Sequence, residues 1–160
     1  MMNSNQFFRK NTLLFFFLLL STVALRAQSN PVIASITPGE YSTDWELFES
    51  TELVNIYYMY VDCSDPVNGV YPEQILFKVE NKTNSKIYVY WDYVLEYNNK
   101  PTKSSPDENL VQVTLDANQS TEGNCANLHK TKLGIFYRYI DGEDVLTDFQ
   151  FQNLSEHKLN

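Results

Sequence analysis

Hydrophobic and polar residues alternate along most of the chain after residue 44. The clearest example is Ile87–Tyr97, in which every second residue is apolar or aromatic. Successive side chains of a strand point to opposite faces, so a period of two predicts a strand with one buried face. Six more segments follow this pattern and are separated by turn-forming residues: 45–48, 53–62, 73–81, 110–115, 133–140 and 145–154. The chain therefore contains about seven predicted strands.

The same region shows no apolar stripe at helical spacing, and Tyr, Val, Ile and Phe, which favour strands, are abundant in it. Short strands at intervals of roughly ten residues are typical of an antiparallel β-sandwich. We therefore predict an all-β, immunoglobulin-like sandwich over residues 45–155, with a small β-barrel as the alternative. Residues 28–44 are expected to form an N-terminal extension or a first edge segment, and residues 156–160 a frayed tail.

The N-terminal residues have the order of a secretory signal peptide. Arg9 and Lys10 precede the apolar run Leu13–Leu20, small residues follow, and residues 1–27 contain no Asp or Glu. This predicts cleavage after Ala27, or after Ala24 as the alternative, and export to the periplasm or the cell exterior. An uncleaved anchor would need about 20 predominantly apolar residues, so we expect no membrane insertion after cleavage.

The charge balance argues against a nucleic-acid partner. The whole chain has a net charge of −8, and loss of residues 1–27 would leave nine basic against twenty acidic residues, or −11. A phosphate backbone favours clustered Lys and Arg. The nine basic residues that remain after residue 27 are instead scattered between acidic residues. The hydrophobic content of 43% is high enough for a packed core and too high for a disordered chain.

Two cysteines, Cys63 and Cys125, lie near the ends of predicted strands. Two cysteines of an exported protein usually pair, and neither has the Cys-x-x-Cys spacing of a redox motif. We therefore predict a structural disulfide near one pole of the sandwich.

The sequence offers few residues for catalysis. His129 and His157 are the only histidines, and both are expected to face solvent. Asp92 and Glu96 share one face of the strand 87–97, which is interpreted as an outward sheet face rather than as a pair of catalytic acids. The sequence therefore predicts no enzyme, no catalytic residue, no metal and no cofactor.

Two acidic loops are the alternative places for a Ca²⁺ ion, because Ca²⁺ is bound by oxygen ligands. Neither loop has the spacing of an EF-hand, and Asp-Gly is already explained as turn chemistry. The residues concerned are Asp62, Asp65 and Asn68 in one loop, and Asp141, Glu143 and Asp144 in the other.

Tyrosines occur on both faces of two predicted strands, and both faces cannot be core. The candidate ligand or partner face consists of Tyr57, Tyr88, Tyr90 and Asp92, although tyrosine is also an ordinary residue of half-buried strands. We predict a non-enzymatic binding or structural module that acts through protein contacts. The alternatives are carbohydrate binding by an exposed Tyr/Trp face, and a hydrolase whose carboxylates the sequence does not identify.

Several motifs occur in a characteristic order: Trp45, Cys63-Ser64-Asp65, Leu76-Phe77-Lys78-Val79-Glu80-Asn81, Gly123-Asn124-Cys125 and Phe149-Gln150-Phe151-Gln152-Asn153-Leu154. In this order the chain resembles small exported proteins of the Bacteroidota. The resemblance spans most of the mature chain and implies an exported bacterial sandwich with a bridge between Cys63 and Cys125. It implies no activity and no site residues.

Overall fold

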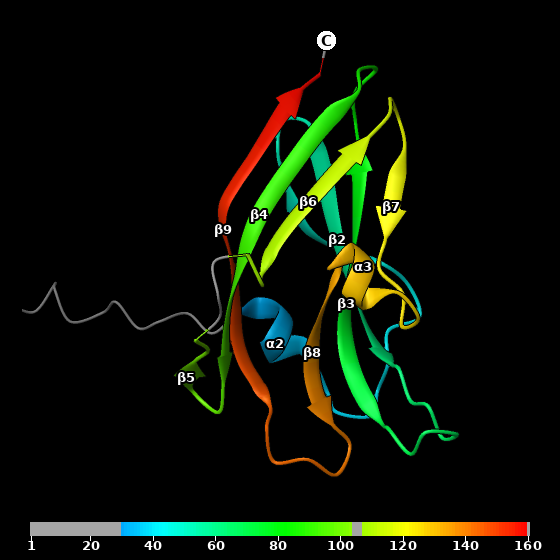
Figure 1. Cartoon of the computed structure of the whole chain (residues 1–160), viewed down its shortest axis with the longest axis vertical. Coiled ribbons are helices and arrows are strands. Elements are labelled where there is room, and N and C mark those ends of the chain that lie inside the picture. The colour runs from blue at the N-terminus through cyan, green and yellow to red at the C-terminus, as the bar shows by residue number, and fades with distance from the viewer. Residues whose placement is uncertain (1–29, 104–106, 160) are drawn as a thin grey trace, which may run out of the picture.

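Two antiparallel sheets pack face to face in the computed structural model, which describes residues 30–103 and 107–159 (Figure 1). The predicted signal peptide lies outside the described residues. Within the described part of the chain the sheets do not join into a closed barrel. The predicted β-sandwich is therefore confirmed, and the barrel alternative is not.

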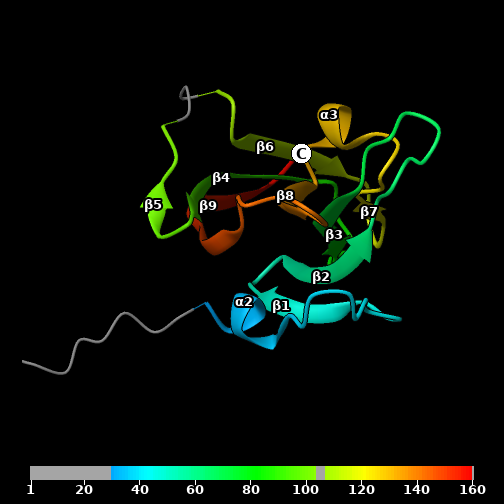
Figure 2. The same cartoon turned by 90° about the horizontal axis from the view of Figure 1, so that it is seen from below.

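The first sheet has the strand order β1-β2-β3, and both β7 and β8 pair with the far side of β3. Its strands are β1 (Glu46–Ser50), β2 (Val54–Asp62), β3 (Pro72–Asn81), β7 (Ser120–Glu122) and β8 (Gly134–Tyr139). In the second sheet β4 is central and pairs with the other three strands. These are β4 (Ile87–Tyr97), β5 (Lys100–Pro101), β6 (Leu110–Leu115) and β9 (Leu146–Lys158). Seen from below, β1 and β2 lie on one side of the molecule and β4, β6 and β9 on the other (Figure 2).

All seven predicted strands are present, and the described residues add four short elements. The strands β5 and β7 have two and three residues, too few to show an alternating pattern. The helices are α2 (Pro31–Ser35) and α3 (Leu128–Thr131), and neither is a candidate membrane span. The segment expected as an extension thus contains α2, which buries Val32 against the core.

The core lies between the sheets and is built from alternate residues of the long strands. In β4, for example, Val89, Trp91 and Tyr93 are buried while the intervening residues are partly exposed. The indole of Trp91 is fully buried and stacks on Phe151 of β9 with 5.0 Å between ring centroids. Trp91 therefore belongs to the core and cannot contribute to an exposed aromatic face.

The last strand is longer than the pattern of residues 145–154 predicts. β9 continues to Lys158, so residues 156–158, expected to be part of a frayed tail, are paired with β4 at Ile87–Val89.

The disulfide between Cys63 and Cys125 is confirmed, with 5.3 Å between the Cα atoms. It connects the end of β2 to the loop before α3. The backbone of Cys63 also donates a hydrogen bond to the carbonyl of Pro72, at 2.9 Å.

Candidate functional site

The four residues of the predicted face do not lie together. Tyr88, Tyr90 and Asp92 alternate with buried residues of β4 and lie on the outer face of the second sheet. Tyr57 alternates with buried residues of β2 and lies on the outer face of the first sheet. Because the inner faces of the two sheets pack against each other, these outer faces are on opposite sides of the molecule.

Tyr57 is held by neighbours on its own sheet. Its hydroxyl donates a hydrogen bond to Glu80 at 2.8 Å, and the ammonium of Lys78 lies 5.8 Å from its ring centroid. The hydrogen bond to Glu80 and partial burial raise the pKa of Tyr57, and the same bond lowers the pKa of Glu80. These contacts give Tyr57 a structural role in joining β2 to β3.

On the second sheet, Tyr88 and Tyr90 lie beside a histidine that sequence reasoning assigned to a frayed end. The Tyr88 and Tyr90 ring centroids are 5.8 Å apart. The imidazole of His157 stacks on Tyr90 at 6.1 Å with 23° between the planes, and its Nε2 lies 3.1 Å from the hydroxyl of Ser155. The two tyrosines and His157 form a row of three rings across two strands.

A β-bulge brings His157 to this face. Tyr90 pairs with Ser155 but Asp92 pairs with Gln152, so two residues of β9 stand opposite Trp91. One of them, Asn153, has a φ of 56°, a conformation that Asn tolerates better than most residues. The extra residue reverses the alternation of β9, so Phe151 points inward before the bulge and His157 points outward after it.

The bulge also redirects two neighbouring polar groups. Asn153 donates a hydrogen bond to the carboxylate of Asp92 at 3.0 Å. Asp92, which the sequence placed on the candidate ligand face, therefore has a partner within the chain. Glu156 turns toward the first sheet, where its carboxylate accepts hydrogen bonds from the Leu53 amide at 3.1 Å and the Thr51 hydroxyl at 2.5 Å.

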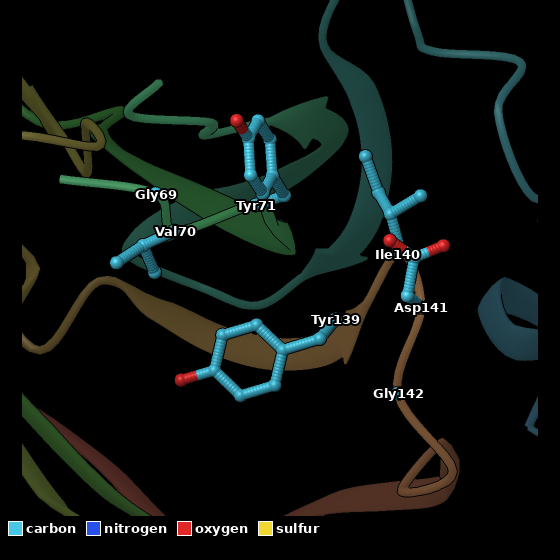
Figure 3. A pocket seen from close by; sticks show the side chains of 7 residues that line it. All are labelled: Gly69, Val70, Tyr71, Tyr139, Ile140, Asp141 and Gly142. Carbon is cyan, nitrogen blue, oxygen red and sulfur yellow. The ribbon is translucent and has the colours of Figure 1, made fainter. Parts of the chain in front are cut away.

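A second candidate site lies at one pole, between the β2–β3 and β8–β9 loops (Figure 3). It is a shallow groove of about 510 Å³, lined by Gly69, Val70, Tyr71, Tyr139, Ile140, Asp141 and Gly142. The Ile140 amide donates a hydrogen bond to the carbonyl of Tyr71 at 3.0 Å, which fixes the two loops side by side. We call this feature the pole groove.

The large side chains of the pole groove are unusually exposed for their type. The exposed fractions are 40% for Val70, 42% for Tyr71, 51% for Tyr139 and 40% for Ile140. Sequence reasoning missed this site because residues 65–69 and 141–144 were interpreted as turns or alternative Ca²⁺ loops, and residues 139 and 140 as the end of a strand. The available signal was the pair Val70-Tyr71 inside a loop segment, where polar residues are the rule.

A buried ion pair lies next to the pole groove. Glu73, on β3 two residues after Tyr71, is 1% exposed and pairs with the guanidinium Nε of Arg138, while the Tyr41 hydroxyl donates to Glu73 at 3.0 Å. Burial raises the pKa of Glu73, but the hydrogen bonds from Arg138 and Tyr41 and the charge of Arg138 together outweigh it. The pKa of Glu73 is therefore below its ordinary value.

In each acidic loop a carboxylate accepts hydrogen bonds from other groups of the chain. Asp65 accepts hydrogen bonds from the side chain of Asn68 at 2.7 Å and from its amide at 3.3 Å, and these bonds lower the pKa of Asp65. Asp144 accepts a hydrogen bond from Asn98 at 3.0 Å. The described residues contain no group of three or more His, Cys, Asp or Glu side chains arranged to hold a metal ion. The side chain of His129 lies outside the described part of the structure.

Comparison with protein-family models, with curated proteins and with solved structures finds no match to this chain.

Proposed function

We propose that the protein is exported after removal of residues 1–27 and acts as a non-enzymatic binding module that holds a protein partner in the pole groove. The observation that carries this proposal is the concave cluster of Val70, Tyr71, Tyr139 and Ile140, each at least 40% exposed. Contiguous apolar surface with a polar rim is characteristic of protein interaction sites. Tyrosine is enriched at such interfaces because a rigid ring gives contact area at low entropic cost.

The charges around the pole groove define the chemistry of the partner. Among the described residues, Asp141 is the one charged residue of the lining, and Asp65, Glu143 and Asp144 belong to the same two loops. An acidic rim attracts Lys and Arg, whereas a second copy of this acidic chain would be repelled. The expected ligand is a peptide segment with an apolar or aromatic anchor beside a basic residue.

The chemistry of the groove favours binding over hydrolysis. Glycosidases generally use a pair of carboxylic acids on either side of the bond that is cleaved. In the part of the chain that the structure describes, the lining of the pole groove includes one carboxylate, that of Asp141. On the second sheet, Asp92 is occupied by Asn153 on an outer strand face rather than in a pocket.

The proposal can be tested with a display library of random twelve-residue peptides selected on the purified protein. We expect the enriched peptides to share an apolar anchor next to Lys or Arg. Their affinity should fall about tenfold in Tyr139→Ser, the loss of one buried aromatic contact, and should weaken with added salt. Ile140→Ser is the second test variant. It removes an apolar side chain of the groove but keeps the backbone hydrogen bond from residue 140 to Tyr71 that holds the two loops together.

The matched control is Tyr88→Ser, which removes a tyrosine from a different face. Peptide affinity should be unchanged in this variant. Failure to enrich any peptide, or equal affinity for the parent protein and both groove variants, would show that the pole groove is not the binding site.

A further inference from the structure

We infer that the outer face of the second sheet binds a neutral oligosaccharide across Tyr88, Tyr90 and His157. This site is separate from the pole groove and does not depend on the function proposed above. Its central feature is the row of three rings, which stands on the strands β4 and β9 and is formed only because the bulge at Asn153 reverses β9.

The hydroxyls of Tyr88 and Tyr90 differ from those of most other tyrosines in the described residues. Five tyrosine hydroxyls donate to a group of the chain: Tyr41 to Glu73, Tyr57 to Glu80, Tyr58 to Glu46, Tyr93 to Lys132 and Tyr97 to Phe136. Within the described chain, the hydroxyls of Tyr88 and Tyr90 have no such partner. These two hydroxyls are therefore available to a ligand.

Among the described residues, the cross-strand neighbours of the tyrosines other than His157 are polar and uncharged, and the nearest carboxylate along β4 is that of Asp92. Thr114 and Gln112 of β6 lie opposite Tyr88 and Tyr90 on one side, and Ser155 of β9 lies opposite Tyr90 on the other. Thr114 and Gln112 are exposed, and Ser155 is half-buried. Hydroxyl and amide groups can both donate and accept hydrogen bonds, as the hydroxyls of a sugar do.

This combination fits a pyranose better than it fits an apolar protein segment. A pyranose has C–H groups that contact an aromatic ring and hydroxyls around its rim that need hydrogen-bond partners. The face is an open sheet surface rather than a pocket, so it suits several units of an extended oligosaccharide rather than one buried small molecule.

The charge of the molecule argues against an anionic sugar. Asp92 lies on the same face one position beyond Tyr90 in the alternation, and the whole chain is acidic. A uronate or sulfate group would be repelled by this field.

The experiment is a glycan array that contains neutral homo-oligosaccharides of hexoses, pentoses and N-acetylhexosamines together with oligouronates, followed by isothermal titration of the best neutral ligand. We expect saturable binding to at least one neutral series and none to the oligouronates. Affinity should fall by about tenfold or more in Tyr90→Ser, while Tyr90→Phe, which keeps the ring, should lose less.

The matched control is Tyr139→Ser, an exposed tyrosine of the pole groove, which should leave sugar binding unchanged. Circular dichroism checks that each variant is folded. Absence of saturable binding to every neutral oligosaccharide would overturn the inference. So would a preference for oligouronates, or an affinity that is unchanged in both Tyr88→Ser and Tyr90→Ser. Because the groove is tested by peptide binding and this face by sugar binding, failure of one proposal is distinguishable from failure of the other.

Discussion

At the scale of single residues, Glu73 carries a carboxylate inside the fold. It is 1% exposed and its partner Arg138 is partly exposed, with 22% of its side chain accessible. A buried charge is tolerated only when it is paired and hydrogen-bonded, and Arg138 and Tyr41 supply both conditions. The pair connects β3 to β8 directly beside the pole groove, so it also fixes the strand that follows Tyr71 and the strand that ends at Tyr139.

Replacement of this carboxylate should destabilise the protein. Glu73→Gln leaves the guanidinium of Arg138 without its charge partner, and we expect a loss of about 2–4 kcal/mol in the free energy of unfolding, reduced by the partial exposure of Arg138. Urea denaturation at pH 7 measures the loss. The control Glu122→Gln, on an exposed residue of β7, should change stability by less than about 0.5 kcal/mol. An unchanged urea midpoint for Glu73→Gln would contradict this role.

The same group predicts a pH dependence. Because folding lowers the pKa of Glu73, its ionised form stabilises the folded state, and this contribution is lost as the pH falls from the ordinary value of 4.5 through the lower folded-state pKa. The difference in stability between the parent protein and Glu73→Gln should therefore be full at neutral pH and shrink in acid. Urea midpoints measured from pH 7 to pH 3 test this, and a constant difference would refute it.

At the scale of elements, the one extra residue in the bulge of β9 decides which side chains of that strand face the core and which face outward. Before the bulge, Phe149 and Phe151 point into the core, where Phe151 stacks on Trp91. After it, Glu156 reaches the first sheet and His157 joins Tyr90 on the outer face. In an unbroken strand the alternation would have pointed His157 inward, because the side-chain period of a strand is two.

The left-handed conformation of Asn153 gives a direct test of the bulge. Asn153→Val places a β-branched residue at a φ of 56° and should destabilise the protein by about 1–2 kcal/mol. Asn153→Gly removes the same hydrogen bond to Asp92 but accepts this φ, so its stability should stay within about 0.5 kcal/mol of the parent. Thermal unfolding compares the two variants. Equal stability of both variants would mean that the bulge does not need this conformation.

At the scale of the whole molecule, the disulfide fixes the loop before α3 to the end of β2. The two cysteines are 62 residues apart in sequence, and the closed loop includes the strands β3 to β7. A bond that closes so long a loop restricts the unfolded chain strongly in the chain-entropy model.

Removal of the disulfide should therefore have a large effect. Cys63→Ser combined with Cys125→Ser should lower the free energy of unfolding by roughly 4 kcal/mol, seen as a lower denaturation midpoint. Intact mass spectrometry of the exported protein should show a chain that starts at Gln28 and is lighter than its reduced form by two hydrogen atoms. A reduced chain that starts at Met1 would contradict both the bridge and the proposed export.

Local pattern is sufficient for much of this fold. The alternation in Ile87–Tyr97 identifies both the strand β4 and its buried face, because the side-chain period of a strand is a property of the backbone alone. The pairing of Cys63 with Cys125 follows from the small number of cysteines together with the signal-like N-terminus, with no need for distances.

The candidate sites depend on contacts between distant segments, which alternation does not encode. Tyr57 and Tyr88 have the same local pattern, yet they lie on opposite outer faces because β2 and β4 belong to different sheets. The pole groove requires Tyr71 and Tyr139, 68 positions apart in sequence, to meet where β3 pairs with β8. His157 reaches Tyr90 only through the bulge at Asn153. Strand pairing and register are set by long-range packing, and for that reason the sites emerge only in the folded chain.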